Sequence, residues 1–218
     1  MNQTNQDVAP THVFNRAAYD VITDLALVAT SETSVVFNAT GKKITVSAHQ
    51  AGTLRLQFGE TRRPDYGLLV KPSAEGSLQM TATEIGWEVA FGDLTMKLAK
   101  TPFRITLEKN GVLLLGSITD QHFRGRSRIP AFGHDAAAGK WCASLALESD
   151  TAVYGFGEKF GPLDKRGQLI RGRTEDALGV NTELSYKNIP FFWTTQGWGM
   201  LIHSTGTVRH GVGYPQWS

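Results

Sequence analysis

The chain has 218 residues, with 22 basic and 20 acidic side chains and a formal net charge of +2. Hydrophobic residues make up 41% of the chain and charged residues 19%, which is typical of a protein with a folded core and excludes a disordered chain. The nearly neutral balance argues against nucleic acid as the main partner, because proteins that bind it usually carry a strong basic excess.

Membrane and secretory signals are also missing from the pattern. No apolar run approaches the roughly 18–20 residues that a membrane helix needs. The start of the chain, Met1–Asp7, has neither the basic nor the apolar stretch of a secretory signal. Cys142 is the only cysteine, which excludes an intrachain disulfide and a zinc site built on several cysteines. We therefore expect a soluble cytoplasmic protein that contacts no membrane.

The period of the apolar residues predicts strands along most of the chain. Residues 1–11 are polar and are expected to form a flexible lead-in to one domain over residues 12–218. The only helix-like periodicity lies at Ala17–Val28, and it lacks a convincing cap pair. Beyond it the period is two, which is typical of β-strands. The predicted strands cover residues 35–37, 44–48, 54–58, 78–82, 87–91, 94–98, 102–107, 112–115 and 141–147.

Turn signals between these strands predict an all-β fold. Gly92-Asp93 and Asn110-Gly111 each separate two apolar strands, and both pairs favour a β-hairpin. Many short strands separated by such turns indicate an antiparallel sandwich or barrel. Two irregular stretches, residues 116–140 and 157–185, are predicted to be long loops, and long loops are often functional.

The common cofactor and metal motifs are not found in the sequence. His203 and His210 would face opposite sides of one strand, so they do not predict a metal site. The glycines of Gly155–Gly161 lack the spacing of a dinucleotide-binding loop, and Pro162 follows where a helix should be under way. We therefore expect neither a metal nor a cofactor.

An acidic pair, Glu175-Asp176, follows a basic stretch of the second irregular segment. Neighbouring cations would keep both carboxylates ionised. From spacing alone, acids on the surface of a loop are the favoured interpretation. No Gly-x-Ser-x-Gly motif accompanies the Ser, His and Asp residues, so a hydrolase triad has no support.

Three ordered motifs change the interpretation of this region. They are Tyr154–Gln168, Glu175–Ala177 and Tyr186–Phe192, and they resemble the N-terminal β-sandwich of glycoside hydrolase family 31, which contains α-glucosidases and α-xylosidases. Leu98–Ile105 and Lys109–Leu114 resemble it as well. The resemblance implies an antiparallel, galactose-mutarotase-like supersandwich packed against a (β/α)₈ barrel of the same protein.

The resemblance also implies where the chemistry lies. Family members are retaining exo-α-glycosidases, in which one carboxylate attacks the anomeric carbon and a second acts as acid and then as base. Both lie on the barrel, and this chain has no βα alternation, so we expect no catalytic residue in it and a sandwich truncated at its C-terminal end. An α-linked glycoside would be bound through the barrel. Exposed strand edges and an apolar barrel-facing patch would favour homo-oligomers of the isolated chain.

The family's sandwich contributes a loop whose Asp hydrogen-bonds the sugar, and the matching position here is Asp176. An ionised carboxylate can accept two hydroxyl donors and orient the ring. Many relatives have an aromatic residue in this motif, whereas this chain reads Arg173-Thr-Glu-Asp-Ala177, so Glu175 is a weaker candidate for the same role.

The remaining residues of the motifs are expected to be architectural. The glycines suit a sharp turn, Glu158 is expected to pair with loop amides or a cation, and the later residues are expected to fix where the loop rejoins the sheet. These residues are Gly155, Gly157, Glu158, Tyr186, Lys187, Asn188 and Pro190.

Two other functions remain open at this point. A free-standing carbohydrate-binding sandwich would bind sugar through exposed aromatic residues such as Trp87, Trp198 or Trp217. An aldose epimerase of the same fold class would need a His general acid and a Glu base, and the sequence offers no local context for such a pair.

Overall fold

The computed structural model describes residues 19–50, 52–60, 67, 69, 76–119, 122–124, 127–176 and 184–214. Within these ranges every regular element is a β-strand and every strand pair is antiparallel, as predicted. In the same ranges no helix is long and apolar enough to cross a membrane. The lead-in expected at residues 1–11 lies outside the described residues. The chain forms two compact units, Met1–Pro64 with Leu69–Ala146, and Asp65–Leu68 with Leu147–Ser218.

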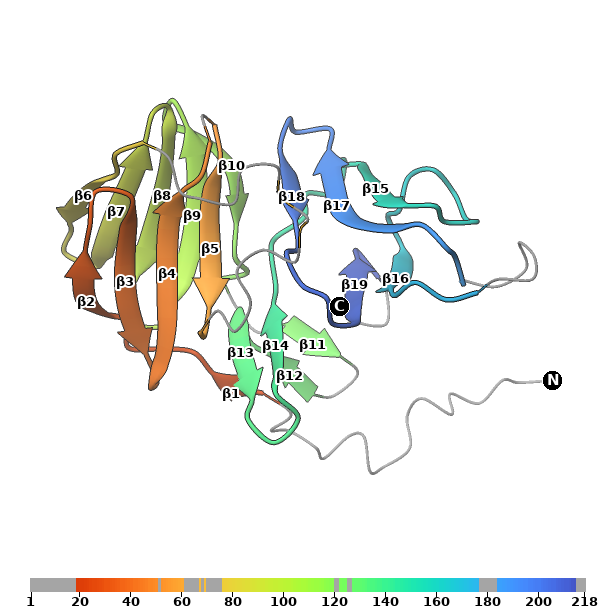
Figure 1. Ribbon diagram of the computed structural model, residues 1–218, viewed down its shortest axis with the longest axis horizontal. Helices are drawn as coiled ribbons and strands as arrows, with labels where there is room; N and C mark the ends of the chain where they lie inside the picture. Colours follow the sequence, from red (N-terminus) through yellow and green to blue (C-terminus); the bar gives the residue numbers. More distant parts are fainter. Residues whose placement is uncertain are drawn as a thin grey trace. The chain divides into compact units, whose positions relative to one another are not determined.

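The first unit contains two large sheets that form the layers of a sandwich (Figure 1). One has the order β2-β3-β4-β5, with β2 at Ala26–Thr30, β3 at Ser34–Ala39, β4 at Lys42–Ala48 and β5 at Leu54–Phe58. The other has the order β10-β9-β8-β7-β6, with β6 at Gln79–Ala82, β7 at Gly86–Phe91, β8 at Leu94–Ala99, β9 at Arg104–Lys109 and β10 at Val112–Gly116.

Alternating apolar residues hold these two sheets together. In the register of β3 and β4, Val35 pairs with Val46 and Phe37 with Ile44, and all four side chains are buried. The Phe37 ring meets the Trp87 ring of β7, with centroids 5.1 Å apart. Only 9% of Trp87 is exposed, so the expectation that Trp87 is an exposed sugar platform is wrong: it belongs to the core.

Both predicted hairpins are confirmed. Phe91 pairs with Leu94 across the Gly92-Asp93 turn, and Lys109 pairs with Val112 across Asn110-Gly111. Asn110 and Gly111 both have positive φ, 50° and 77°, which is the conformation that makes Asn-Gly a strong hairpin signal.

A third sheet in the first unit occupies much of the chain that was predicted to be irregular. It has the order β1-β13-β14, with β1 at Asp20–Val21, β13 at Phe132–Asp135 and β14 at Lys140–Ala143, and a further hairpin joins β11 (His122–Arg124) to β12 (Ser127–Ile129). The prediction of one long loop over 116–140 is therefore wrong. The described part of the helix-like stretch, residues 19–28, forms no helix, because backbone groups there pair with β13 and β3.

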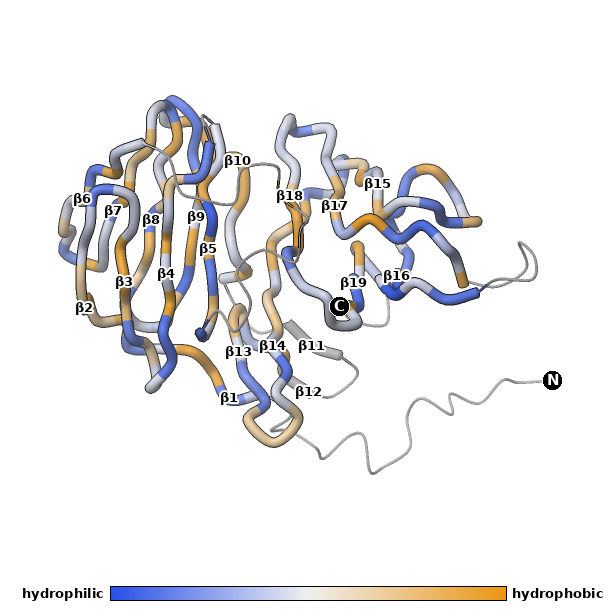
Figure 2. The backbone as a smooth tube through the Cα atoms, viewed as in Figure 1, coloured by the Kyte–Doolittle hydropathy of each residue, from blue (hydrophilic) through white to orange (hydrophobic). Residues whose placement is uncertain are grey.

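The second unit contains two small sheets around one apolar cluster. One has the order β15-β17-β18, with β15 at Val153–Gly157, β17 at Asn188–Thr194 and β18 at Gly199–Leu201; the other pairs β16 (Gln168–Gly172) with β19 (Val208–Val212). Figure 2 shows apolar residues within β17. The cluster draws Val153 and Phe156 from β15, Ile170 from β16 and Val212 from β19. Strand β16 thus interrupts the loop predicted for residues 157–185.

Candidate functional site

The glycines that end β15 allow a very close approach to the chain returning at β17. Gly155 and Gly157 have φ values of 113° and 78°. A Cβ on Gly155 would lie 2.6 Å from the carbonyl oxygen of Phe191, and one on Gly157 would lie 2.2 Å from that of Lys187. Any other residue would be strained at both positions and would overlap backbone atoms. The N–H of Glu158 donates to the same Lys187 oxygen at 2.8 Å.

The side chain of Glu158 has a buried oxygen, Oε2, without a hydrogen-bond partner among the described residues. The pairing expected for this carboxylate stays a prediction, whereas its backbone N–H joins the end of β15 to the returning chain.

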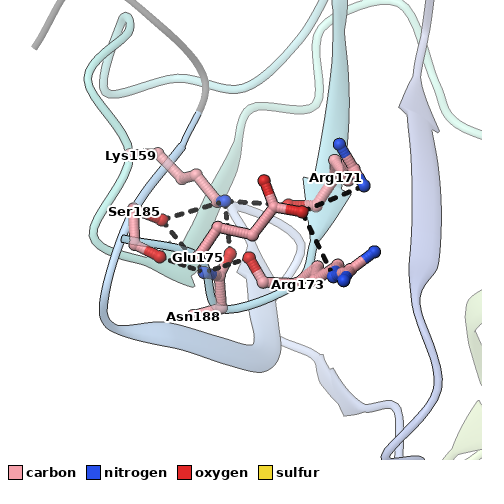
Figure 3. A network of polar contacts seen from close by, with 6 residues as sticks. All are labelled: Lys159, Arg171, Arg173, Glu175, Ser185 and Asn188. Atoms are coloured by element: carbon pink, nitrogen blue, oxygen red, sulfur yellow. Dashed lines mark hydrogen bonds and ion pairs between the residues drawn. The ribbon is translucent and has the colours of Figure 1, made fainter. Parts of the chain in front are cut away.

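An ammonium group lies at the centre of the polar network in Figure 3. Lys159 Nζ donates to the carbonyl oxygen of Arg171 at 2.8 Å, to Ser185 Oγ at 3.2 Å and to Asn188 Oδ1. Lys159 follows β15, Arg171 belongs to β16, and Asn188 begins β17. One side chain therefore connects three segments that are far apart in the sequence.

Asn188 adds a second set of hydrogen bonds to this network. Its Nδ2 donates to the carbonyl oxygen of Arg173 at 2.7 Å, to that of Ser185 at 2.9 Å and to Ser185 Oγ at 3.0 Å. Ser185 is completely buried, and its polar atoms find the partners that buried polar groups require. We call Lys159, Ser185 and Asn188 the loop clamp, because they tie together the two ends of the segment 173–185.

The two acidic candidates have different surroundings. Glu175 Oε1 lies 3.1 Å from Arg171 Nη2 and 3.1 Å from Arg173 Nε, so this carboxylate is paired with two guanidinium groups. Its backbone N–H donates to the carbonyl oxygen of Ser185 at 3.1 Å. Asp176 is exposed and makes no hydrogen bond or ion pair with the described residues. Of the two candidates, Asp176 is therefore the one whose carboxylate has no partner among the described residues.

The other residues of the third motif lie where the chain enters β17. The side chains of Tyr186 and Lys187 are exposed, and Lys187 contributes its carbonyl oxygen to the contact with β15. The carbonyl oxygen of Pro190 accepts the N–H of Ile202 at 2.7 Å.

The turn before β16 is held by the side chains of Asp164 and Lys165. Asp164 Oδ1 accepts the N–H groups of Arg166 and Val153, each at 3.0 Å. These bonds, with that from Arg166 the stronger, hold the pKa of Asp164 below its usual value. The next residue, Lys165, is buried and donates from Nζ to the carbonyl oxygen of Pro162 at 2.6 Å, and burial lowers its pKa. Both residues lie within the Tyr154–Gln168 motif, but no separate role was predicted for either.

His210 lies in the apolar cluster of the second unit. Its ring centroid is 4.7 Å from that of Phe156. Burial, and to a smaller extent the positive charge of Lys159, lower the pKa of His210 to about 4. No group of three or more His, Cys, Asp or Glu side chains in the described ranges could hold a metal ion.

Two exposed aromatic residues that were not predicted lie on β17. Phe191 and Trp193 of β17 are 39% and 47% exposed, and their rings stack with centroids 6.2 Å apart. Trp198 is partly buried and meets the edge of Phe192, and Trp217 lies outside the described residues.

The sequence analysis did not predict the loop clamp, although the sequence does carry a signal for the ion pairs beside it. Arg171, Arg173 and Glu175 are spaced by two, so an extended chain places them on one side, where opposite charges can pair. Lys159 gave no comparable signal, because its partners lie 12 to 29 residues further along the chain.

Comparison with known proteins identifies this architecture. Residues 43–209 match the profile of the glycosyl hydrolase 31 N-terminal galactose mutarotase-like domain. An α-xylosidase of Lactiplantibacillus pentosus is 29% identical over 136 residues, which are 61% of this chain and 17% of that protein. An α-xylosidase of Emericella nidulans is 42% identical over 66 residues, which are 30% of this chain and 8% of that protein. The chain thus spans less than a fifth of the length of these relatives.

Solved structures share the fold. A Flavobacterium johnsoniae GH31 dextranase, complexed with glucose, superposes with a TM-score of 0.71 at 20% identity, over 89% of this chain and 24% of that one. A GH31 α-xylosidase from a soil metagenome, complexed with xylose, gives a TM-score of 0.66 at 18% identity, over 87% of this chain and 29% of that one.

Proposed function

Because this chain belongs to the glycosyl hydrolase 31 N-terminal galactose mutarotase-like family, we propose that it acts as the non-catalytic β-sandwich domain of a retaining exo-α-glycosidase of the α-xylosidase or α-glucosidase type. The reaction would hydrolyse an O-glycosyl bond. Its nucleophile and its acid/base carboxylate would come from a catalytic barrel, the intramolecular partner of this domain. The substrate would be an α-linked glycoside.

The observation that carries this proposal is the exposed Asp176 carboxylate beside the loop clamp. Asp176 would accept hydroxyl hydrogen bonds from the sugar at the mouth of the barrel and orient the ring for attack. Glu175, the weaker candidate, is engaged by Arg171 and Arg173, which favours Asp176 for this role.

This role can be tested by steady-state kinetics of the native protein purified from its source cell. With p-nitrophenyl α-xyloside and α-glucoside as substrates, Asp176→Asn should lower kcat/KM about 10- to 100-fold, since hydrogen bonds to a charged group contribute about 1.5–3 kcal/mol. Asp150→Asn, which changes an exposed acid elsewhere in the second unit, should leave the kinetics unchanged. Unchanged kinetics for Asp176→Asn would remove this residue from the proposal.

A second candidate is the free-standing carbohydrate-binding module, favoured by the exposed, stacked rings of Phe191 and Trp193. Aromatic faces of this kind suit the apolar face of a sugar ring. The size of the polypeptide in its source cell, measured by immunoblot, separates the two functions. A barrel adds about 250 residues, so the enzyme should have at least roughly 470. A band of this chain's own mass would leave the binding module as the function to test.

A further inference from the structure

The two described ends of the segment 173–185, residues 173–176 and 184–185, are joined by hydrogen bonds immediately next to Asp176. The carbonyl oxygen of Ser185 accepts two donors, Asn188 Nδ2 at 2.9 Å and the N–H of Glu175 at 3.1 Å. Glu175 directly precedes Asp176 in the chain. The hydrogen bond of the Glu175 N–H therefore holds the backbone one residue before Asp176.

Lys159 and Asn188 hold the closure from outside the segment. The ammonium of Lys159 donates to the carbonyl oxygen of Arg171, which precedes the segment, and to the hydroxyl of Ser185, which ends it (Figure 3). Asn188 accepts from Lys159 and donates to the carbonyl oxygens of Arg173 and Ser185. Both side chains thus contact the entering and the returning chain at once.

The side chain of Glu175 also fixes the backbone next to Asp176, through ion pairs with two arginines. Its Oε1 contacts Arg171 and Arg173, each at 3.1 Å, and both arginines also supply the carbonyl oxygens that the clamp uses. Glu175 is consequently anchored through its backbone and its side chain, and the next carboxylate along the chain is the exposed one.

We propose that Lys159 and Asn188 are positioning residues: together with Ser185 they fix the backbone at Glu175 and thereby the direction in which Asp176 is presented to a sugar. The positioning of the backbone is independent of what Asp176 binds, whereas its consequence for sugar recognition rests on the proposed function.

Hydrogen–deuterium exchange tests the positioning directly in the full chain. Lys159→Met removes the ammonium, and Asn188→Asp keeps an acceptor for Lys159 while removing the amide donors to Arg173 and Ser185. Each variant should speed the exchange of the Glu175 amide about tenfold or more, because its hydrogen bond opens more often. Lys187→Met, which changes an exposed lysine next to Asn188, should leave this exchange as it is. Wild-type exchange at Glu175 in both clamp variants would overturn the proposal.

A double-mutant cycle in the source protein tests the consequence. Lys159→Met should raise KM for the α-xyloside about tenfold with a smaller change in kcat, since a misplaced contact weakens recognition. Combined with Asp176→Asn it should add little, because both changes remove the same contact. Additive effects would overturn the action through Asp176. If Asp176→Asn alone is silent while Glu175 exchanges faster in the clamp variants, the positioning is supported and the proposed role of Asp176 fails.

Discussion

A Cβ atom on Gly157 would lie 2.2 Å from the carbonyl oxygen of Lys187 and 2.6 Å from the nitrogen of Ile189, so the turn after β15 touches the returning chain with no room for a side chain. The obstacle is backbone, which cannot rotate away as a flexible side chain could. Gly157 also has a φ of 78°, a conformation that other residues adopt at a cost.

Gly157→Ala should therefore lower the free energy of unfolding by about 3 kcal/mol or more, through the overlap and the backbone strain together. Gly167→Ala is the matched control, because Gly167 has a similar φ of 80° and nothing within 4 Å of its Cβ position. It should cost only about 1 kcal/mol. Urea unfolding would measure both. Equal losses would show that φ alone requires glycine at position 157.

Local signals predicted the sandwich of the first unit well. Asn110-Gly111 fixed a hairpin because the turn needs two residues that tolerate positive φ, and strands such as β4 alternate buried and half-buried side chains. Sheet β1-β13-β14 was not predictable in the same way. It is held by contacts across the chain, such as Phe132 against Phe58 and Phe103, with centroids 5.3 and 4.9 Å apart.

In the candidate site, too, local motifs were predictable from the sequence and contacts between distant segments were not. The motif around Asp176 was recognisable because its residues are consecutive, and the resemblance gave it a role. The loop clamp joins Lys159 to acceptors at Arg171, Ser185 and Asn188, and no local pattern marks a lysine that donates to neutral oxygens on other segments. Such networks depend on the tertiary fold that brings the segments together.

His210 should make the second unit sensitive to mild acid. Its pKa is lowered to about 4 by burial and by Lys159, whereas an unfolded histidine titrates near 6.5. Between these values the unfolded state binds more protons, so stability is lost as the pH falls from about 6.5 to about 4, by at most about 3 kcal/mol.

Urea unfolding at pH 7.5, 5.5 and 4.5 would measure this loss. His210→Gln should lower stability at pH 7.5, because the ring leaves Phe156, but should flatten the dependence on pH in this range. His203→Gln leaves His210 in place and should keep the wild-type dependence. An unchanged dependence in His210→Gln would assign the acid sensitivity to another group.

Cys142 should be unreactive while the first unit is folded. Burial raises the pKa of this thiol to about 12, against a smaller lowering by a hydrogen bond from the backbone of Gly133. Because the thiolate is the reactive form, alkylation by iodoacetamide at pH 8 should be at least about a hundredfold slower than in 6 M urea. Mass spectrometry would follow the single adduct. Equal rates in the two conditions would contradict the protection of the Cys142 thiol in the folded protein.

The contact between Phe37 and Trp87 should carry much of the stability of the sandwich, because it joins the inner faces of its two sheets. Phe37 is completely buried, so Phe37→Ala should cost about 3–5 kcal/mol through lost apolar burial and the cavity left behind. Val112, at the edge of the other sheet, is 66% exposed, and Val112→Ala should change stability by no more than about 0.5 kcal/mol. Tryptophan fluorescence during urea unfolding would report both values. Losses of similar size would mean that the two sheets do not enclose a common core.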